Sequence, residues 1–170
     1  NPTNYPPKVT GIVQTKDIII NTGSSLEITS AATLNLYGNF VNSGSFLAQS
    51  GSNFVVKGSA SQSLSGVGSL SNLTIDKTNA ADEVGFFSST DVNGTIRLLN
   101  GVLSTNNNIT LNFDNGANIA YNASDAGSIV GNVTAKRNLV AKTHYIGVPF
   151  SGVTSAQVEA NSSQNVSIDI

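Results

Sequence analysis

The chain has 170 residues, a formal net charge of −2 and no cysteine, so disulfides, thiol chemistry and zinc–thiolate sites are excluded. The eight Lys and Arg residues are scattered along the chain, which argues against the clustered basic surface that nucleic acid requires. Ser, Thr, Asn and Gly account for 76 of the 170 residues, yet 39% of the chain is hydrophobic and regularly distributed. That combination favours a folded protein over a disordered one.

Residues 1–17 begin with a proline-rich stretch. Three of the four prolines fall in NPTNYPPKVT, and proline fixes φ and removes a backbone donor. We therefore expect residues 1–17 to form an extended lead-in or an N-terminal cap. The longest apolar run, Ile18–Ile20, is too short to cross a bilayer, so membrane insertion is not expected. Methionine is absent, and we expect the chain to be a processed product or a fragment.

Residues 18–135 carry short alternating apolar pairs, each bounded by Gly, Asn or Ser. The pairs are Leu26/Ile28, Leu34/Leu36, Phe54/Val56, Leu73/Ile75, Ile96/Leu98 and Ile109/Leu111. A period of two residues is typical of β-strands, and the small polar residues between the pairs favour turns. The segment is therefore expected to consist of short strands joined by tight turns.

Asparagine recurs at nearly constant spacing along the same segment, at Asn35, Asn53, Asn72, Asn93, Asn112 and Asn132. A repeat of this length cannot bury its own apolar face, but stacked repeats can. We therefore predict an all-β fold, a right-handed parallel β-helix (β-solenoid) with about 19 residues per coil. The asparagines are expected to form a ladder by bonding to one another from coil to coil.

The repeat fades from residue 136 onward. The segment KRNLVAKTHYIGVPFSGV is richer in charge and aromatic residues than the chain before it. We predict that residues 136–170 form a C-terminal cap and the start of a following segment. Such a cap would cover the strand edges that an open solenoid end exposes.

Several stretches of the chain are similar to a known group of proteins. LNLYGNFVNSGSFLAQSGSNFVVKGSASQSLSG, LSNLTIDKT and GTIRLLNGVLSTNNNITL resemble the repetitive β-solenoid regions of large secreted proteins of the Bacteroidetes. RNLVAKTHYIGVPFSG resembles the segment that closes such regions, so the resemblance covers about residues 18–152. It implies export, often by type IX secretion, to the cell surface or the medium. It supplies no shared catalytic residues.

Carboxylates are the first candidates for chemistry, because glycoside cleavage needs two of them converging on one bond. Residues one coil apart are neighbours in a β-solenoid, which places Asp76 near Lys57 or Asp91, and Asp114 near Asp91. The pair Asp82–Glu83 is adjacent in sequence. Because acids at turns are commonly just solvated, we expect no catalytic pair among them.

His144 is the only histidine, and it lies beside Tyr145 and near Lys142. A general base or a metal ligand is one interpretation of this residue. With no cysteine and no nearby acid, we expect instead a surface residue of the cap. Lys136–Arg137, Lys142 and His144 form a small basic cluster, which we interpret as a solvated face, with contact to an anionic polysaccharide as the alternative.

Two further patterns have ordinary explanations. The sequence Asp114–Gly116 has ligand types suited to calcium, but it also fits an ordinary Asn-Gly turn, which we expect. Asn-x-Ser/Thr sequons, including those at Asn72, Asn93, Asn108 and Asn132, are expected from composition alone.

Together these features predict a non-catalytic extracellular structural or adhesive module, a spacer, stalk or fibre unit of a secreted surface protein. No catalytic, cofactor-binding or metal-binding residue is assigned. The alternative is a carbohydrate-binding or carbohydrate-active β-helix domain acting on a polysaccharide, with Tyr37 and Tyr121 as candidates for stacking against sugars. The expected partners are a second copy joined end to end or a cell-surface polysaccharide, and neither nucleic acid nor a membrane.

Overall fold

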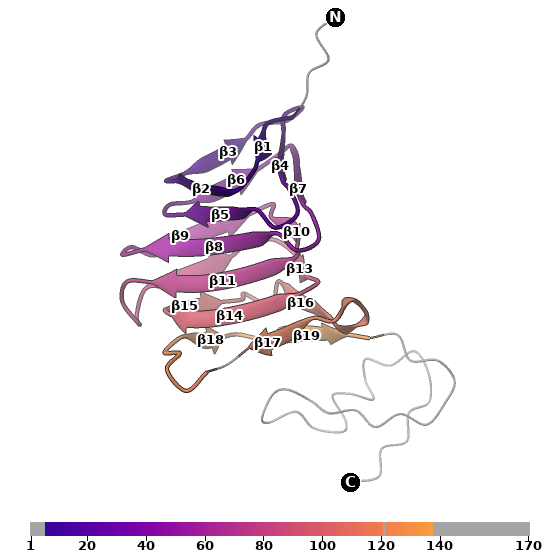
Figure 1. The fold of residues 1–170 in the computed structure, drawn as a ribbon. Helices are drawn as coiled ribbons and strands as arrows, with labels where there is room; N and C mark the ends of the chain where they lie inside the picture. Colours follow the sequence, from indigo (N-terminus) through magenta and orange to yellow (C-terminus); the bar gives the residue numbers. More distant parts are fainter. Residues whose placement is uncertain (1–5, 121, 138–170) are drawn as a thin grey trace, which may run out of the picture. The chain divides into compact units, whose positions relative to one another are not determined.

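A computed structural model describes residues 6–120 and 122–137, which form a β-solenoid of about six turns. Each turn, or coil, contributes three short strands, and equivalent strands of successive coils pair in parallel except at one interruption (Figure 1). Equivalent positions lie roughly 21 residues apart. The predicted all-β parallel β-helix is therefore confirmed, while its right-handed sense stays a prediction.

The strands form three stacked sheets around one core. Sheet I consists of β2 (Ile12–Thr15), β5 (Thr33–Leu36), β8 (Asn53–Gly58), β11 (Asn72–Lys77), β14 (Thr95–Asn100) and β17 (Asn118–Ala120). Sheet II consists of β3 (Ile18–Ile20), β6 (Phe40–Asn42), β9 (Gln62–Ser65), β12 (Glu83–Phe86), β15 (Val102–Ser104) and β18 (Ser128–Val130). Sheet III has two parts: β1 (Lys8–Val9), β4 (Ser25–Ile28) and β7 (Ser45–Ala48), then β10 (Gly68–Leu70), β13 (Thr90–Val92), β16 (Ile109–Asn112) and β19 (Val133–Lys136). A 3-10 turn, η1 (Phe113–Asn115), follows β16.

The interior is filled by apolar side chains that stack from coil to coil. Leu34, Phe54, Leu73 and Ile96 lie in one register of sheet I, and each is almost completely buried. Their neighbours along each strand point outward, which is the alternation that the sequence shows. Burial of each such side chain stabilises the fold by about 1.5–3 kcal/mol. Because each side chain is buried against the coils above and below it, every coil depends on its neighbours for stability.

Three aromatic rings meet in the core where the three sheets face one another. Phe40 comes from β6, Phe46 from β7 and Phe54 from β8. Their ring centroids are 5.0, 5.7 and 6.1 Å apart, and all three pairs pack edge to face. This geometry adds to area burial by about 0.5–1.5 kcal/mol per pair. The trio ties all three sheets together in the second and third coils.

The coils are on average longer than the sequence predicted, because the corners between strands vary in size. Phe54 pairs with Leu73, an interval that matches the predicted spacing, whereas the interval from Leu103 to its partner Ile129 is clearly longer. Turns absorb such insertions because they lie at the surface and leave the inward alternation of the strands intact. The spacing of about 19 residues predicted from the sequence therefore underestimates the average length of a coil.

Stacking already begins within residues 1–17. β1 pairs with β4, and β2 pairs with β5, so both strands belong to the first coil. Val9 of β1 is buried. At the other end β19 continues sheet III. The cap predicted over residues 136–170 lies outside the described residues, apart from Lys136 and Arg137.

Sheet III is interrupted between β7 and β10, which no ladder of hydrogen bonds joins. Gly66 lies just before β10 with a φ of 70°, and a Cβ there would collide with the backbone oxygen of Asn42. The Asn42 amide donates to the Gly66 carbonyl (2.8 Å), and the Gly66 N–H donates to Ser88 Oγ (2.5 Å). Glycine permits both the left-handed backbone and this close approach.

Candidate functional site

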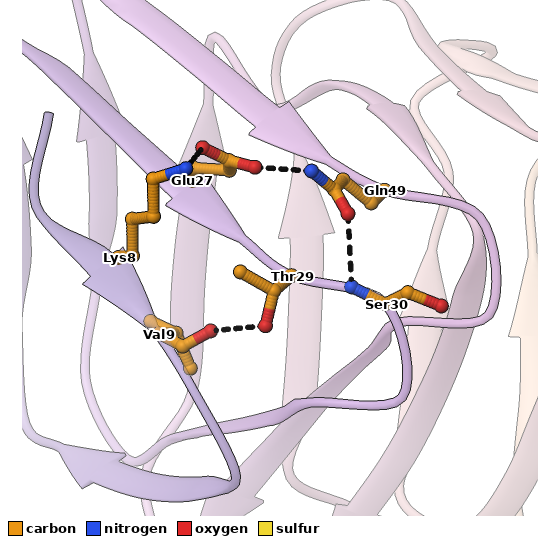
Figure 2. Close-up of polar contacts among 6 residues, drawn as sticks. All are labelled: Lys8, Val9, Glu27, Thr29, Ser30 and Gln49. Atoms are coloured by element: carbon orange, nitrogen blue, oxygen red, sulfur yellow. Dashed lines mark hydrogen bonds and ion pairs between the residues drawn. The ribbon is translucent and has the colours of Figure 1, made fainter.

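Polar side chains of the first three coils join one another on sheet III and at the corner that leads from it to sheet I (Figure 2). Lys8 Nζ lies 2.8 Å from Glu27 Oε2, and Gln49 Nε2 donates to Glu27 Oε1. Gln49 Oε1 in turn accepts from the backbone N–H of Ser30 (3.1 Å). Lys8, Glu27 and Gln49 come from three successive coils, so this network holds the coils together and leaves the Glu27 carboxylate mostly buried.

A buried lysine occupies the corner between sheets I and II. Lys77 is only 3% exposed, and its Nζ donates to the backbone oxygens of Lys57 (3.0 Å) and Ala60 (2.8 Å) and to Gln62 Oε1. Burial lowers the pKa of Lys77 because it disfavours the charged amine, and the negative charge of Asp82 partly opposes this. Three acceptors satisfy the three donors of the ammonium group.

The lysine is one member of a polar column that crosses four coils. Gln62 Nε2 donates to the backbone oxygen of Gly38 in the coil before it (2.5 Å). Asn100 Nδ2, in the coil after Lys77, donates to the backbone oxygens of Lys77 (3.0 Å) and Thr78 (3.1 Å). A column of this kind satisfies corner carbonyls that no strand ladder reaches, so its role is structural.

The lowered pKa of Lys77 predicts a pH dependence of stability. Between the lowered folded-state pKa and the ordinary value of 10.5, the unfolded chain binds the proton more readily than the folded chain. The free energy of unfolding should therefore rise as pH increases through this window. Urea unfolding should be measured from neutral pH to 10.5 for the wild type and for Lys77→Ala as the control. The free energy of unfolding should rise with pH in the wild type and not in the variant. An equal pH slope in both proteins would contradict it.

The asparagine ladder predicted from the sequence exists only as two separate pairs. Asn72 Nδ2 donates to Asn53 Oδ1 (3.3 Å) in sheet I, and Asn112 Nδ2 donates to Asn93 Oδ1 (3.2 Å) beside sheet III. Asn93 does not lie opposite Asn72. It follows β13 of sheet III, whereas Asn72 begins β11 of sheet I. The prediction of a continuous asparagine ladder is therefore wrong.

The two ends of that predicted ladder are also out of register. Asn35 pairs with Val55 and not with Asn53. Asn132 precedes β19, whose first residue pairs with Ile109, so it does not lie opposite Asn112. Each pairing follows the apolar register of the strands, which outweighs a single side-chain hydrogen bond of about 1 kcal/mol.

The structure brings together one of the predicted charged pairs. Lys57 Nζ and Asp76 Oδ2 form an ion pair across neighbouring strands of sheet I. Asp91 lies instead on β13 of sheet III, where it pairs in register with Ser69 and Thr110. An Asp76–Asp91 pair is therefore not formed, since the two acids belong to different sheets.

The other acids lie at turns or near the ends of strands. Asp82 accepts from the backbone N–H of Asn79 (3.1 Å) and from its amide (3.0 Å), which closes the turn before β12. Glu83 is exposed at the start of β12. Asp114 lies in η1, and Thr110 rather than Asp114 is the register partner of Asp91. The turn expected at Asp114–Gly116 is present, with Gly116 in the left-handed region at φ 82°.

A polar groove of about 410 Å³ lies at the corner between sheets III and I, near the interruption in sheet III. Its lining consists of Ala48, Ser50, Ser71, Asn93 and Asn115. Asn115 Nδ2 donates to Asn93 Oδ1 (2.8 Å), and Ser71 Oγ accepts from the Gly51 N–H (2.9 Å). These contacts use the groove's polar groups to tie neighbouring coils together, and the lining holds neither an aromatic ring nor a charge.

Two aromatic side chains of the described residues are exposed on the outer faces of the sheets. Tyr37, a predicted sugar-stacking residue, follows β5 and is 42% exposed. Phe87 follows β12 and is 62% exposed. Phe87 was not predicted from the sequence, although the pair Phe86–Phe87 carries a signal, since one of two adjacent strand residues must face outward. Tyr121, Lys142, His144 and Tyr145 lie outside the described residues.

The buried positions of Lys77 and Gln62 were not predicted from the sequence either. Lysine at the end of a strand normally projects into water, and no pattern in the sequence marks this one as buried. Within residues 6–120 and 122–137, no group of three His, Asp or Glu side chains is arranged to hold a metal ion. The same part of the chain contains no helix long and apolar enough to span a membrane.

No protein-family model, curated protein or solved structure matches this chain.

Proposed function

We propose that this chain is a non-catalytic structural or adhesive module, a spacer or stalk of a secreted surface protein. The observation that supports the proposal is that polar side chains form hydrogen bonds from one coil to the next. Glu27, Lys77 and the asparagine pairs bond to groups in neighbouring coils. Each added coil lengthens such a stack by about 4.8 Å and extends one continuous core, which suits a spacer.

Export to the cell surface is the second part of the proposal. It is supported by the resemblance of the repeats to secreted β-solenoid regions of the Bacteroidetes, which also favours type IX secretion. Fibre formation is supported by β1, β2 and β3, which end their sheets among the described residues and so offer edges for end-to-end contact.

The non-catalytic role is tested by incubating the purified chain with a panel of soluble polysaccharides. The expected result is no increase in reducing ends or unsaturated products over a buffer control. Sustained release of either product would contradict the proposal. A heat-unfolded sample of the same chain serves as the matched control for contaminating enzymes.

Surface display is tested on intact cells that express the full-length protein. Protease added outside the cells should remove the segment from subsequent immunoblots, while a cytoplasmic marker stays intact. Protection of the segment until the cells are lysed would overturn the extracellular assignment.

Carbohydrate binding is the second candidate function, favoured by Tyr37. Tyr37 is exposed and directly follows β5, one residue beyond the register pair Leu36–Val56, and Lys57 of the Lys57–Asp76 ion pair directly follows Val56. An exposed ring near polar groups suits sugar stacking. Affinity electrophoresis in gels containing a polysaccharide tests this. Tyr37→Ala should abolish any retardation, while Ile12→Ala, another exposed residue of sheet I, should leave it unchanged. Absence of retardation for the wild type in every gel would remove the candidate.

A further inference from the structure

The large exposed apolar side chains are concentrated on one wall of the solenoid. Ile19, Val41, Phe87 and Val130 are 71%, 42%, 62% and 57% exposed, and all four belong to sheet II or directly follow one of its strands. The other three, Ile12, Tyr37 and Leu47, are divided between sheets I and III. Exposed apolar side chains that gather on one face are a common mark of an interaction site.

Four of the outward residues of sheet II form a single row, one from each successive coil. Ile19 pairs with Val41, and Val41 pairs with Ser65. Phe87 lies opposite Ser65, because its N–H donates to the carbonyl of the preceding residue, Leu64 (2.8 Å). Neighbouring strands are about 4.8 Å apart, so Val41 and Phe87 stand at nearly equal distances on either side of Ser65.

The ring of Phe87 is held against the sheet by a glycine. A Cβ added to Gly85 would lie 2.8 Å from Phe87 Cε2, so the ring rests on the Gly85 backbone. The second outward row runs through Asp17, Asn39, Ser63, Gly85, Ser104 and Val130, and its charge is confined to Asp17 at the end of the row. The charged residues Asp17 and Glu83 lie at the margins of this surface.

We propose that the outer face of sheet II is a self-association surface on which two copies of the chain pack face to face around a two-fold axis near Ser65. The axis brings Phe87 of each copy against Val41 of the other and places small Ser65 residues at the centre. The centre of the face, from Val41 through Ser65 to Phe87, is neutral, so the proposed contact desolvates no charge at the axis and opposes no like charges there. Such a contact is isologous and closes at a dimer.

This dimer goes beyond the proposed spacer role and differs from end-to-end assembly. Sedimentation equilibrium should show that the wild type dimerises. Phe87→Ser and Val41→Ser should each raise the dissociation constant at least about tenfold, as expected for central apolar contacts. Leu47→Ser and Ile12→Ser remove similarly exposed residues from other faces and should leave it unchanged. Thermal unfolding of each variant checks that the fold is retained.

A cysteine placed on the proposed axis gives a second readout in this cysteine-free chain. Facing sheets pack about 10 Å apart, which is too far for a disulfide, so a short bismaleimide is the appropriate cross-linker. Ser65→Cys should be captured as a covalent dimer, whereas Ser45→Cys, exposed on β7 of sheet III, should remain monomeric.

Three results would overturn this surface. One is a wild type that stays monomeric at high concentration, and another is equal cross-linking of the two cysteine variants. The third is a dimer weakened by Ile12→Ser but not by Phe87→Ser, which would place the contact at the end of the stack. None of them would alter the spacer proposal, which depends on the product assay and on surface display.

Discussion

Phe54→Asp is expected to prevent the chain from folding at 25 °C. Phe54 is 1% exposed and packs edge to face against Phe40 and Phe46. Loss of such a ring costs about 3–5 kcal/mol, and an unpaired buried carboxylate adds several more. The sum is comparable to the total stability of an ordinary domain. Circular dichroism should show loss of the β signal, and the loss should involve several coils together.

The matched control for this variant is Val55→Asp, one residue further along β8. Val55 is half-buried and faces outward, so its aspartate remains hydrated, and a change within about 1 kcal/mol is expected. Equal unfolding midpoints for the two variants would show that the inward register assigned to sheet I is wrong.

Lys77→Ala is expected to destabilise the fold by about 3 kcal/mol in urea titrations. The substitution leaves Gln62 Oε1 and the carbonyls of Lys57 and Ala60 without their donor, at about 1–3 kcal/mol for each buried group. Part of this cost is offset because the buried ammonium group no longer has to be desolvated.

Lys57→Ala is the control for the buried lysine. Lys57 lies on the neighbouring strand, and it forms its ion pair with Asp76 while both side chains remain partly exposed. Loss of such a pair should cost less than about 1 kcal/mol. If both lysine variants lose the same small amount of stability, then the polar column does not support the corners.

The strands and their stacking could be predicted from the sequence because both depend on a local pattern. Pairs such as Leu34/Leu36 and Leu73/Ile75 alternate with a period of two, and a short repeat buries such pairs only by stacking. Phe54 and Leu73 prove to be register partners, as the Asn53 to Asn72 spacing implied. Local alternation and one correct interval were enough to specify the architecture.

The register of the corners could not be predicted, because the corners differ in length. Two residues separate Leu70 from Leu73, three separate Val92 from Ile96, and a longer stretch containing η1 precedes Ile119. The additional residue in the second of these corners is Gly94. A side chain would not fit there, because a Cβ would lie 2.5 Å from Asn72 Oδ1. These insertions move Asn93 and Asn112 off the strand that Asn72 begins, which divides the ladder into pairs.

The candidate sites were harder to predict than the fold. The Lys57–Asp76 pair was identified from coil spacing, because its two members lie on straight, adjacent strands. Lys77 was not, since its burial depends on the shape of a corner and on carbonyls from the preceding coil. Phe87 was missed because the inward or outward direction of Phe86–Phe87 is fixed only by the tertiary register of β12 with β9.

The pairing of residues one coil apart is tested most directly by engineered cysteines in this cysteine-free chain. Val55 and Thr74 are register partners on adjacent strands, about 4.8 Å apart, which lies within the range that a disulfide spans. Thr74 in turn pairs with Arg97, which places Val55 and Arg97 two strands apart. The solenoid predicts an intramolecular disulfide in Val55→Cys/Thr74→Cys and none in Val55→Cys/Arg97→Cys, as read by intact mass of the folded monomer. A disulfide in the second variant, or none in the first while it remains folded, would contradict the stacked-coil structure.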